Sequence, residues 1–190
     1  MNSSLQTHVK GHVLIKDART GEVLLDKFNA VHNKNMATAI ARGLSSNANA
    51  GIFRIKLGNG GSSVSGISGI IFQSPNIVSP SATLYNTTWT EIVDSSSTLV
   101  GTGNSVTYQS TGSTDNSVVI ICTATIAADE PADQLLTDSS STSTNNPYAF
   151  DELGLFTQDN LLLTHLVFSP ILKTANREFV VVYTLTVSVS

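Results

Sequence analysis

The chain has 190 residues, of which 41% are hydrophobic and only 13% are charged, and its formal net charge is −4. This length suits a single domain, residues 1–190, with one sizeable core, and the negative balance argues against nucleic-acid binding, which needs a basic face. No apolar run approaches the ~20 residues that cross a bilayer, and residues 1–12 lack a signal-peptide pattern, so we expect a soluble chain that is not secreted.

The N-terminal part of the sequence predicts a β-hairpin. Apolar and polar side chains alternate over residues 9–16, which is the period of a strand with one buried face. Asp17 opens and Gly21 closes a segment of turn-forming residues. A second extended run follows over residues 22–27, so the two strands are expected to pair.

A helix is expected next, near residues 33–44. Met36, Ile40 and Leu44 fall on one apolar stripe, and the alanines between them favour a helix. Asn29 and Asn33 are both suitable N-cap residues, so the start of the helix is open by about one turn.

Residues 52–57 predict another strand, which leads into the glycine-rich segment 58–63. Phosphate binding is not expected here, because no Gly-Lys-Ser/Thr follows and no helix opens after the glycines. We interpret the segment as a sharp turn into a long loop at about 58–82, whose apolar patch over 67–72 is unusual for a free loop.

The middle of the chain predicts three strands. Residues 83–93 carry Trp89, the one tryptophan, which we interpret as a core or interface anchor rather than a ligand platform. Residues 105–110 predict a short edge strand. Residues 117–127 are apolar on both faces, which favours a central strand, and Cys122 within them is expected to be a buried structural thiol.

A second long loop is expected at about 128–147. Its acidic residues do not have the spacing of a calcium loop, so a solvated loop is the preferred interpretation. Residues 148–157 and 161–169 predict a hairpin with Asp159 and Asn160 at its turn. Residues 177–190 predict one long strand, too apolar to remain an open edge.

Nothing in the sequence predicts catalysis, a metal site or a cofactor. His8, His12, His32 and His165 show no metal-ligand spacing. An enzyme would require a pocket that gathers His12 or His165 with a carboxylate.

Asp151 and Glu152 are adjacent, so on a strand they would point to opposite faces rather than act as a pair. One of them is expected to be buried and paired, for example with Arg177 or Lys173.

The predicted fold class is mainly β. About eight or nine strands and one helix, spaced in this way, favour an antiparallel, jelly-roll-like β-sandwich.

Several segments together resemble virion structural proteins of tailed bacteriophages. They are KGHVLIKDARTGEVLLDKFNAVHNKNMATAIARGL at 10–44, IFRIKLGNGG at 52–61, FDELGLFT at 150–157 and LLLTHLVFSPILKTANREFVVVYT at 161–184. The resemblance implies a subunit of a symmetric particle, assembled in the host cytoplasm, and it carries over no catalytic residues.

We therefore expect a non-enzymatic virion subunit of the tail, baseplate or neck region, which contacts copies of itself and other structural proteins. The expected subunit contacts are the apolar residues Ile67, Ile70, Ile71, Phe72 and Trp89. A capsid decoration protein is the first alternative, and a receptor- or carbohydrate-binding module is the second.

Overall fold

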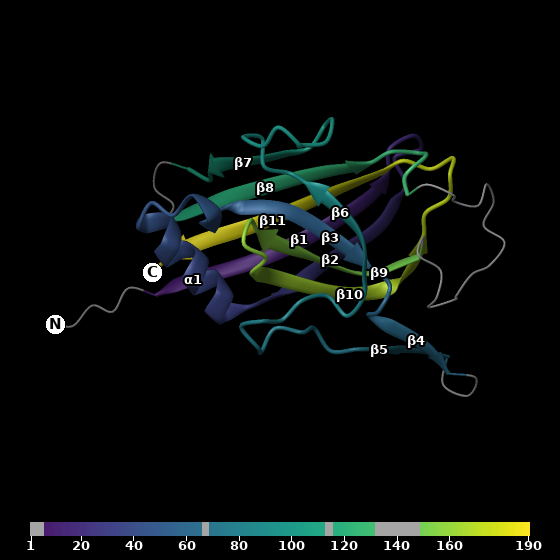
Figure 1. The fold of residues 1–190 in the computed structure, drawn as a ribbon, viewed down its shortest axis with the longest axis horizontal. Coiled ribbons are helices and arrows are strands. Elements are labelled where there is room, and N and C mark those ends of the chain that lie inside the picture. The colour runs from purple at the N-terminus through teal and green to yellow at the C-terminus, as the bar shows by residue number, and fades with distance from the viewer. Residues whose placement is uncertain (1–5, 66–68, 113–115, 132–148) are drawn as a thin grey trace.

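The computed structural model describes residues 6–65, 69–112, 116–131 and 149–190. Over these ranges nine strands form one antiparallel sheet that curls into a half-barrel, with the helix α1 at one end (Figure 1). The elements are β1 (Thr7–Asp17), β2 (Val23–Val31), α1 (Asn33–Leu44), the 3₁₀ turn η1 (Ala48–Ala50), β3 (Ile52–Gly58), β4 (Ser62–Ser65), β5 (Gly69–Phe72), β6 (Thr87–Ile92), β7 (Ser105–Ser110), β8 (Ser117–Ile126), β9 (Ala149–Thr157), β10 (Leu162–Leu172) and β11 (Phe179–Val189).

The sheet has the strand order β6-β3-β9-β10-β2-β1-β11-β8-β7, and β4 and β5 form a separate two-stranded sheet. We call the strands β6-β3-β9-β10 one wall of the half-barrel and the strands β1-β11-β8-β7 the other, and β2 joins the two walls. Its residues from Val23 to Asn29 pair with β1, whereas Ala30 and Val31 pair with β10. A strand that changes partner along its length turns a corner in the sheet, and this corner produces the curl.

The two edge strands, β6 and β7, are consecutive in the sequence and are joined by residues 93–104. Asn104, at the end of this loop, forms hydrogen bonds to residues on both sides of the opening between β6 and β8. Its side-chain Nδ2 donates to Glu91 Oε2 at 2.9 Å and to the Ile92 carbonyl at 3.0 Å, and its Oδ1 accepts from the Thr125 N–H at 2.7 Å. One buried amide side chain therefore links β6 to β8 where the backbone ladder does not.

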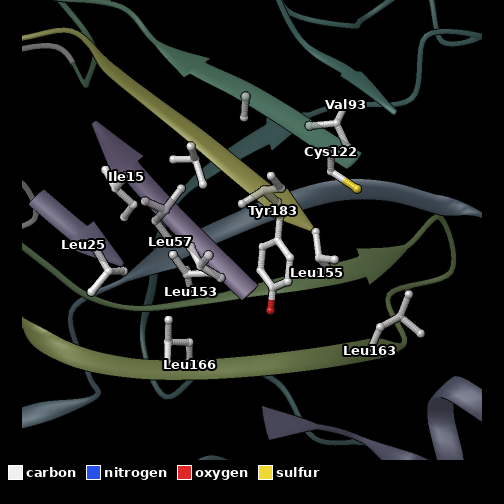
Figure 2. Packing of buried hydrophobic residues seen from close by; sticks show 14 of the residues in the cluster. Ile15, Leu25, Leu57, Val93, Cys122, Leu153, Leu155, Leu163, Leu166 and Tyr183 are labelled. Atoms are coloured by element: carbon white, nitrogen blue, oxygen red, sulfur yellow. The ribbon is translucent and has the colours of Figure 1, made fainter. Parts of the chain in front are cut away.

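The core lies between the two walls (Figure 2). Tyr183 stands at its centre, fully buried, and its hydroxyl donates to Thr164 Oγ1 at 2.6 Å and accepts from Asn29 Nδ2. Alternate residues of β11 face inward beside it, as the period of two predicts. The hydroxyl thus joins three strands within an otherwise apolar interior.

The mainly β class is as predicted, and the described residues contain one α-helix, which begins and ends at the predicted residues 33 and 44. The half-barrel is not a clear sandwich, so the jelly-roll-like arrangement is not confirmed. The long C-terminal strand has its expected partners, because β11 pairs with both β1 and β8.

Some local predictions were wrong. The N-cap of α1 is neither Asn29 nor Asn33: it is His32, whose Nδ1 accepts from the Asn35 N–H at 3.2 Å. The strand β8 is not central but next to the edge, with β7 as its outer neighbour.

The long loop expected at 58–82 contains the hairpin β4–β5, in which Ser62–Ser65 pair with Gly69–Phe72. The strand expected at 83–93 begins only at Thr87. The strand expected to end at residue 169 continues to Leu172, with its ladder to β9 interrupted between Val167 and Ile171, around Pro170, which cannot donate a ladder hydrogen bond.

The turn between β1 and β2 depends on the buried carboxylate of Asp17. Its Oδ1 accepts from the Arg19 and Thr20 N–H groups, both at 3.0 Å, and its Oδ2 accepts from Arg177 Nε at 2.9 Å. Burial raises the pKa of Asp17, but the hydrogen bonds from Arg177 and the two N–H groups outweigh burial and lower the pKa to about 2.

We expect Asp17→Asn to lower the free energy of unfolding by roughly 1–2 kcal/mol near neutral pH, since the charge-assisted hydrogen bonds are lost. The folded pKa of about 2 lies below the ordinary value of 3.8, so the carboxylate stabilises the fold fully above pH 3.8 and its contribution is lost as the pH falls towards about 2. Urea unfolding at several pH values measures this difference.

Asp26→Asn is the matched control, since Asp26 binds His12 Nε2 at 2.6 Å but its side chain is 63% exposed. Exposed pairs contribute little, so this variant should stay within about 0.5 kcal/mol of the wild type. Equal losses in the two variants would contradict the role assigned to Asp17.

Candidate functional site

One surface feature of the described residues is the hairpin arm, which we define as β4 and β5. It extends away from the half-barrel at the end opposite α1 (Figure 1). Its register pairs Val64 with Ile70 and Ser62 with Phe72, so the three apolar side chains share one face, and Ile71 lies on the other. Their exposed fractions are 53% for Val64, 38% for Ile70, 46% for Ile71 and 49% for Phe72.

Of the predicted contact residues, the structure therefore brings Ile70, Ile71 and Phe72 together on the arm. Ile67 lies outside the described residues. Trp89 does not join them: it is half-buried on β6, packs against the core, and donates from Nε1 to Glu91 Oε1 at 2.6 Å. It lines a separate depression of about 670 Å³ between β6 and the end of β8.

The base of the arm is fastened by Glu152, a fully buried carboxylate of β9. Its Oε1 accepts from the N–H groups of Asn86 at 2.7 Å and Gly60 at 3.1 Å, and its Oε2 accepts from the Tyr85 N–H at 2.9 Å. His165 Nε2 lies 3.0 Å from Oε2. The cluster joins the segment before the arm, the segment before β6, and the strands β9 and β10.

The protonation states in this cluster follow from its geometry. Nδ1 of His165 accepts a hydrogen bond from the Asn76 N–H at 2.8 Å, so Nε2 carries the ring proton and donates a hydrogen bond to Glu152. Burial raises the pKa of Glu152, but hydrogen bonds from His165 and the N–H groups of Asn86 and Tyr85 outweigh burial, so the pKa is lowered. Glu152 is therefore a charged acceptor surrounded by donors.

Asp151 holds the next turn of the same segment. Its Oδ1 accepts from the Gly61 N–H at 2.8 Å, and its Oδ2 accepts from Ser62 N–H at 2.8 Å and Ser62 Oγ at 2.6 Å. Burial raises the pKa of Asp151, the neighbouring charge of Glu152 raises it further, and hydrogen bonds from Ser62 and Gly61 only partly oppose this. Since Ser62 is the first residue of β4, Asp151 sets the direction in which the arm leaves the body.

The predicted pairing of these carboxylates was only partly right. Both are buried, but Arg177 binds Asp17 and Glu22 instead. Lys173 is also buried, and its Nζ donates to the carbonyls of Ala127 at 2.7 Å and Ala128 at 3.2 Å. Asp151 and Glu152 are adjacent on β9 and point to opposite sides, as expected. Both nevertheless accept hydrogen bonds from the glycine-rich segment, Asp151 from the Gly61 N–H and Glu152 from the Gly60 N–H.

Two histidines hold residues 73–82 onto the body. His32 Nε2 donates to the Ser79 carbonyl at 2.7 Å, and His165 Nδ1 accepts from the Asn76 N–H. The part of the predicted long loop that follows the arm is therefore fastened rather than projecting. Sequence reasoning missed both roles, because a histidine that binds a distant backbone leaves no local pattern.

Two histidine–carboxylate pairs have the geometry of acid–base catalysis, but neither is placed where a substrate could bind in a cavity. His165 and Glu152 meet the distance condition for a general base and its carboxylate, and so do His12 and Asp26. The first pair is fully buried, and neither pair is among the described residues that line the depression beside Trp89 or the groove beside α1. Among the described residues, no group of three His, Cys, Asp or Glu side chains is placed to hold a metal ion.

Cys122 lies fully buried in the same core cluster as Val93 (Figure 2), and burial raises the pKa of its thiol to about 12. Since the thiolate is the reactive form, we expect no labelling by a thiol reagent in the native protein and complete labelling in denaturant. Absorbance of the released thiol product over time measures both. Rapid labelling of the folded chain would contradict the structural role predicted for this residue.

No helix within the described ranges combines the length and the apolar character needed to cross a membrane. Comparisons with protein-family models, curated proteins and solved structures give no match to this chain.

Proposed function

We propose that the chain is a non-enzymatic structural subunit of a tailed-bacteriophage virion. In this proposal it is assembled in the host cytoplasm, joins the tail, baseplate or neck region, and contacts copies of itself and other structural proteins. The observation that supports the proposal best is the hairpin arm, whose apolar side chains are exposed on a hairpin that projects from the body. Exposed apolar side chains grouped in this way are typical of interaction surfaces.

The attachment of the arm also favours an assembly role. A two-stranded hairpin is marginally stable by itself, and its position here is set by the buried carboxylates Asp151 and Glu152. An arm with a defined direction can enter a partner without a large loss of conformational entropy. The resemblance of the sequence to phage virion proteins points to the same role.

Electron microscopy of phage particles that carry the labelled protein tests this function. We expect the label at the tail, baseplate or neck. Label on the head facets would support the capsid decoration alternative instead, and purified particles without the protein would contradict the virion role altogether.

The carbohydrate-binding alternative is favoured by one observation. Trp89 is half-buried, and the depression that it lines also contains Glu91, Glu130 and Thr125. Aromatic and polar side chains of this kind can bind a sugar face and its hydroxyls. Because Trp89 is the one tryptophan, its fluorescence during titration with glycans reports directly on this surface. An unchanged spectrum across a broad glycan set would exclude the alternative.

We also propose that the half-barrel is a variant of the jelly-roll-like β-sandwich expected from the sequence. Side chains of β1, β8 and β11 on one wall pack against those of β3, β9 and β10 on the other, as two stacked sheets do.

A further inference from the structure

An apolar groove of about 440 Å³ lies at the α1 end of the half-barrel, between α1 and the strands β7, β8 and β11. Its floor is continuous with the core, since Met36 and Leu185 belong to both. Its rim is exposed: the exposed fractions are 38% for Ile40, 38% for Val118 and 79% for Tyr108. A volume of this size is in the range of sites that accept a ligand or a few inserted side chains.

The groove and the hairpin arm are chemically matched. None of the described residues that line the groove is charged, and the sequence from Ser62 to Gln73 contains no charged residue. The surface elsewhere carries ion pairs such as that of Arg42 with Asp159. One surface is concave and the other projects, and both expose aliphatic and aromatic side chains to water. Burying one in the other removes two exposed apolar surfaces at once.

The groove also borders a free strand edge. In the described part of the chain β7 pairs only with β8, so its outer edge offers backbone N–H and C=O groups. An exposed edge is a template for an added strand, and β5 or β4 could supply one.

The arm of a molecule cannot fill its own groove. In Figure 1, which places the longest axis horizontally, the arm and α1 lie at opposite ends of the molecule. The occupant that the chain itself provides is therefore the arm of another copy.

We propose that the hairpin arm of one copy inserts Val64, Ile70 and Phe72 into the groove of the next copy, beside β7. The contact joins two different surfaces, so copies associate head to tail, and the geometry generates a ring if the rotation closes and a filament if it does not. This inference rests on the proposed assembly function and specifies its partner, a second copy of the chain.

Two variants separate this arrangement from others. The arm variant carries Ile70→Ser and Phe72→Ser, and the groove variant carries Tyr108→Glu and Val118→Glu. All four side chains are at least one third exposed, so the fold should be retained, and circular dichroism with thermal unfolding checks this. The matched control is Leu99→Ser, which removes an apolar side chain that is 73% exposed outside both surfaces.

Light scattering and sedimentation of the full chain give the masses. We expect the wild type and the control to form species larger than the 20.0 kDa chain, and each variant alone to be a monomer. An equimolar mixture of the two variants should form a complex of twice the chain mass and nothing larger. In that complex the intact arm of the groove variant occupies the intact groove of the arm variant.

A monomeric wild type at the highest concentration tested would overturn the inference. So would variants that keep the wild-type mass, or a mixture that stays monomeric after both variants have lost assembly, which indicates a contact between identical surfaces. Binding of an apolar dye in the groove of a monomeric wild type would identify a small-molecule site instead.

The outcomes also separate the inference from the virion role. If the mixture forms the complex but labelled protein is not found in particles, the inference stands and the virion role fails. If the protein is in particles and both variants enter them as the wild type does, the virion role stands and the inference fails.

Discussion

Replacing Glu152 with alanine is expected to lower the free energy of unfolding by about 3–5 kcal/mol at neutral pH. The change leaves the N–H groups of Gly60, Tyr85 and Asn86 and the Nε2–H of His165 without their buried acceptor. Chemical denaturation followed by circular dichroism measures the loss.

The pH dependence of this loss has a definite sign. The pKa of Glu152 is lowered from its ordinary value of 4.5, because the hydrogen bonds outweigh burial. A lowered folded pKa means that the carboxylate stabilises the fold above pH 4.5 and that this contribution is lost as the pH falls through the folded value. The difference between wild type and variant should therefore shrink in acid.

Glu22→Ala is the control, because Glu22 binds Arg177 at 3.2 Å with a side chain that is 62% exposed. We expect a change within about 0.5 kcal/mol. If Glu152→Ala does not fold, Glu152→Gln keeps one acceptor oxygen and should give a smaller, measurable loss. A Glu152→Ala variant as stable as Glu22→Ala would refute the anchoring role.

The second large effect is expected at Gly58, where alanine should cost about 2–4 kcal/mol. A Cβ at this position would lie 2.3 Å from the Asn86 carbonyl oxygen and 2.7 Å from Glu152 Oε1. The backbone cannot move away without breaking the hydrogen bonds of Glu152. Thermal and urea unfolding of Gly58→Ala measure the cost.

Gly43→Ala is the matched control, since a Cβ built there meets no described atom within 4 Å apart from its chain neighbours and the nearby backbone of its own helix. This glycine is in α1, where alanine is the better helix former, so stability should be unchanged or raised by up to about 1 kcal/mol. Equal effects at the two glycines would show that the close approach at Gly58 does not limit the fold.

Elements whose cause lies within one segment were predictable from the sequence, whereas features that join distant segments were not. The alternation in β1 and β11 and the stripe of Met36 and Ile40 act within one element, so the strands and the helix were predictable. The strand order was not, because it depends on β2 changing partner at Ala30, and nothing in residues 22–31 specifies β10 as that partner.

The site shows the same division. The exposed residues Ile70, Ile71 and Phe72 stood out as an apolar patch in a polar segment, and the structure exposes them on the arm. The glycine-rich segment was interpreted as a turn. In the structure, the backbone of Asn86 lies so close to Gly58 and Gly60 that a Cβ at either position would clash with it. That approach joins segments distant in sequence, so composition alone does not reveal it.

The hydrogen bonds of Asn104 imply that neighbouring strands of the half-barrel are not all held together equally strongly. Along β1 and β11 a ladder running from Thr7 to Asp17 must break before the strands separate. Between β6 and β8 the side chain of Asn104 provides a polar link, with three hydrogen bonds. We therefore expect local opening at this joint, through fluctuations that leave the rest of the ladder intact. The half-barrel is therefore closed between β6 and β8 by a side chain, Asn104, rather than by a backbone ladder.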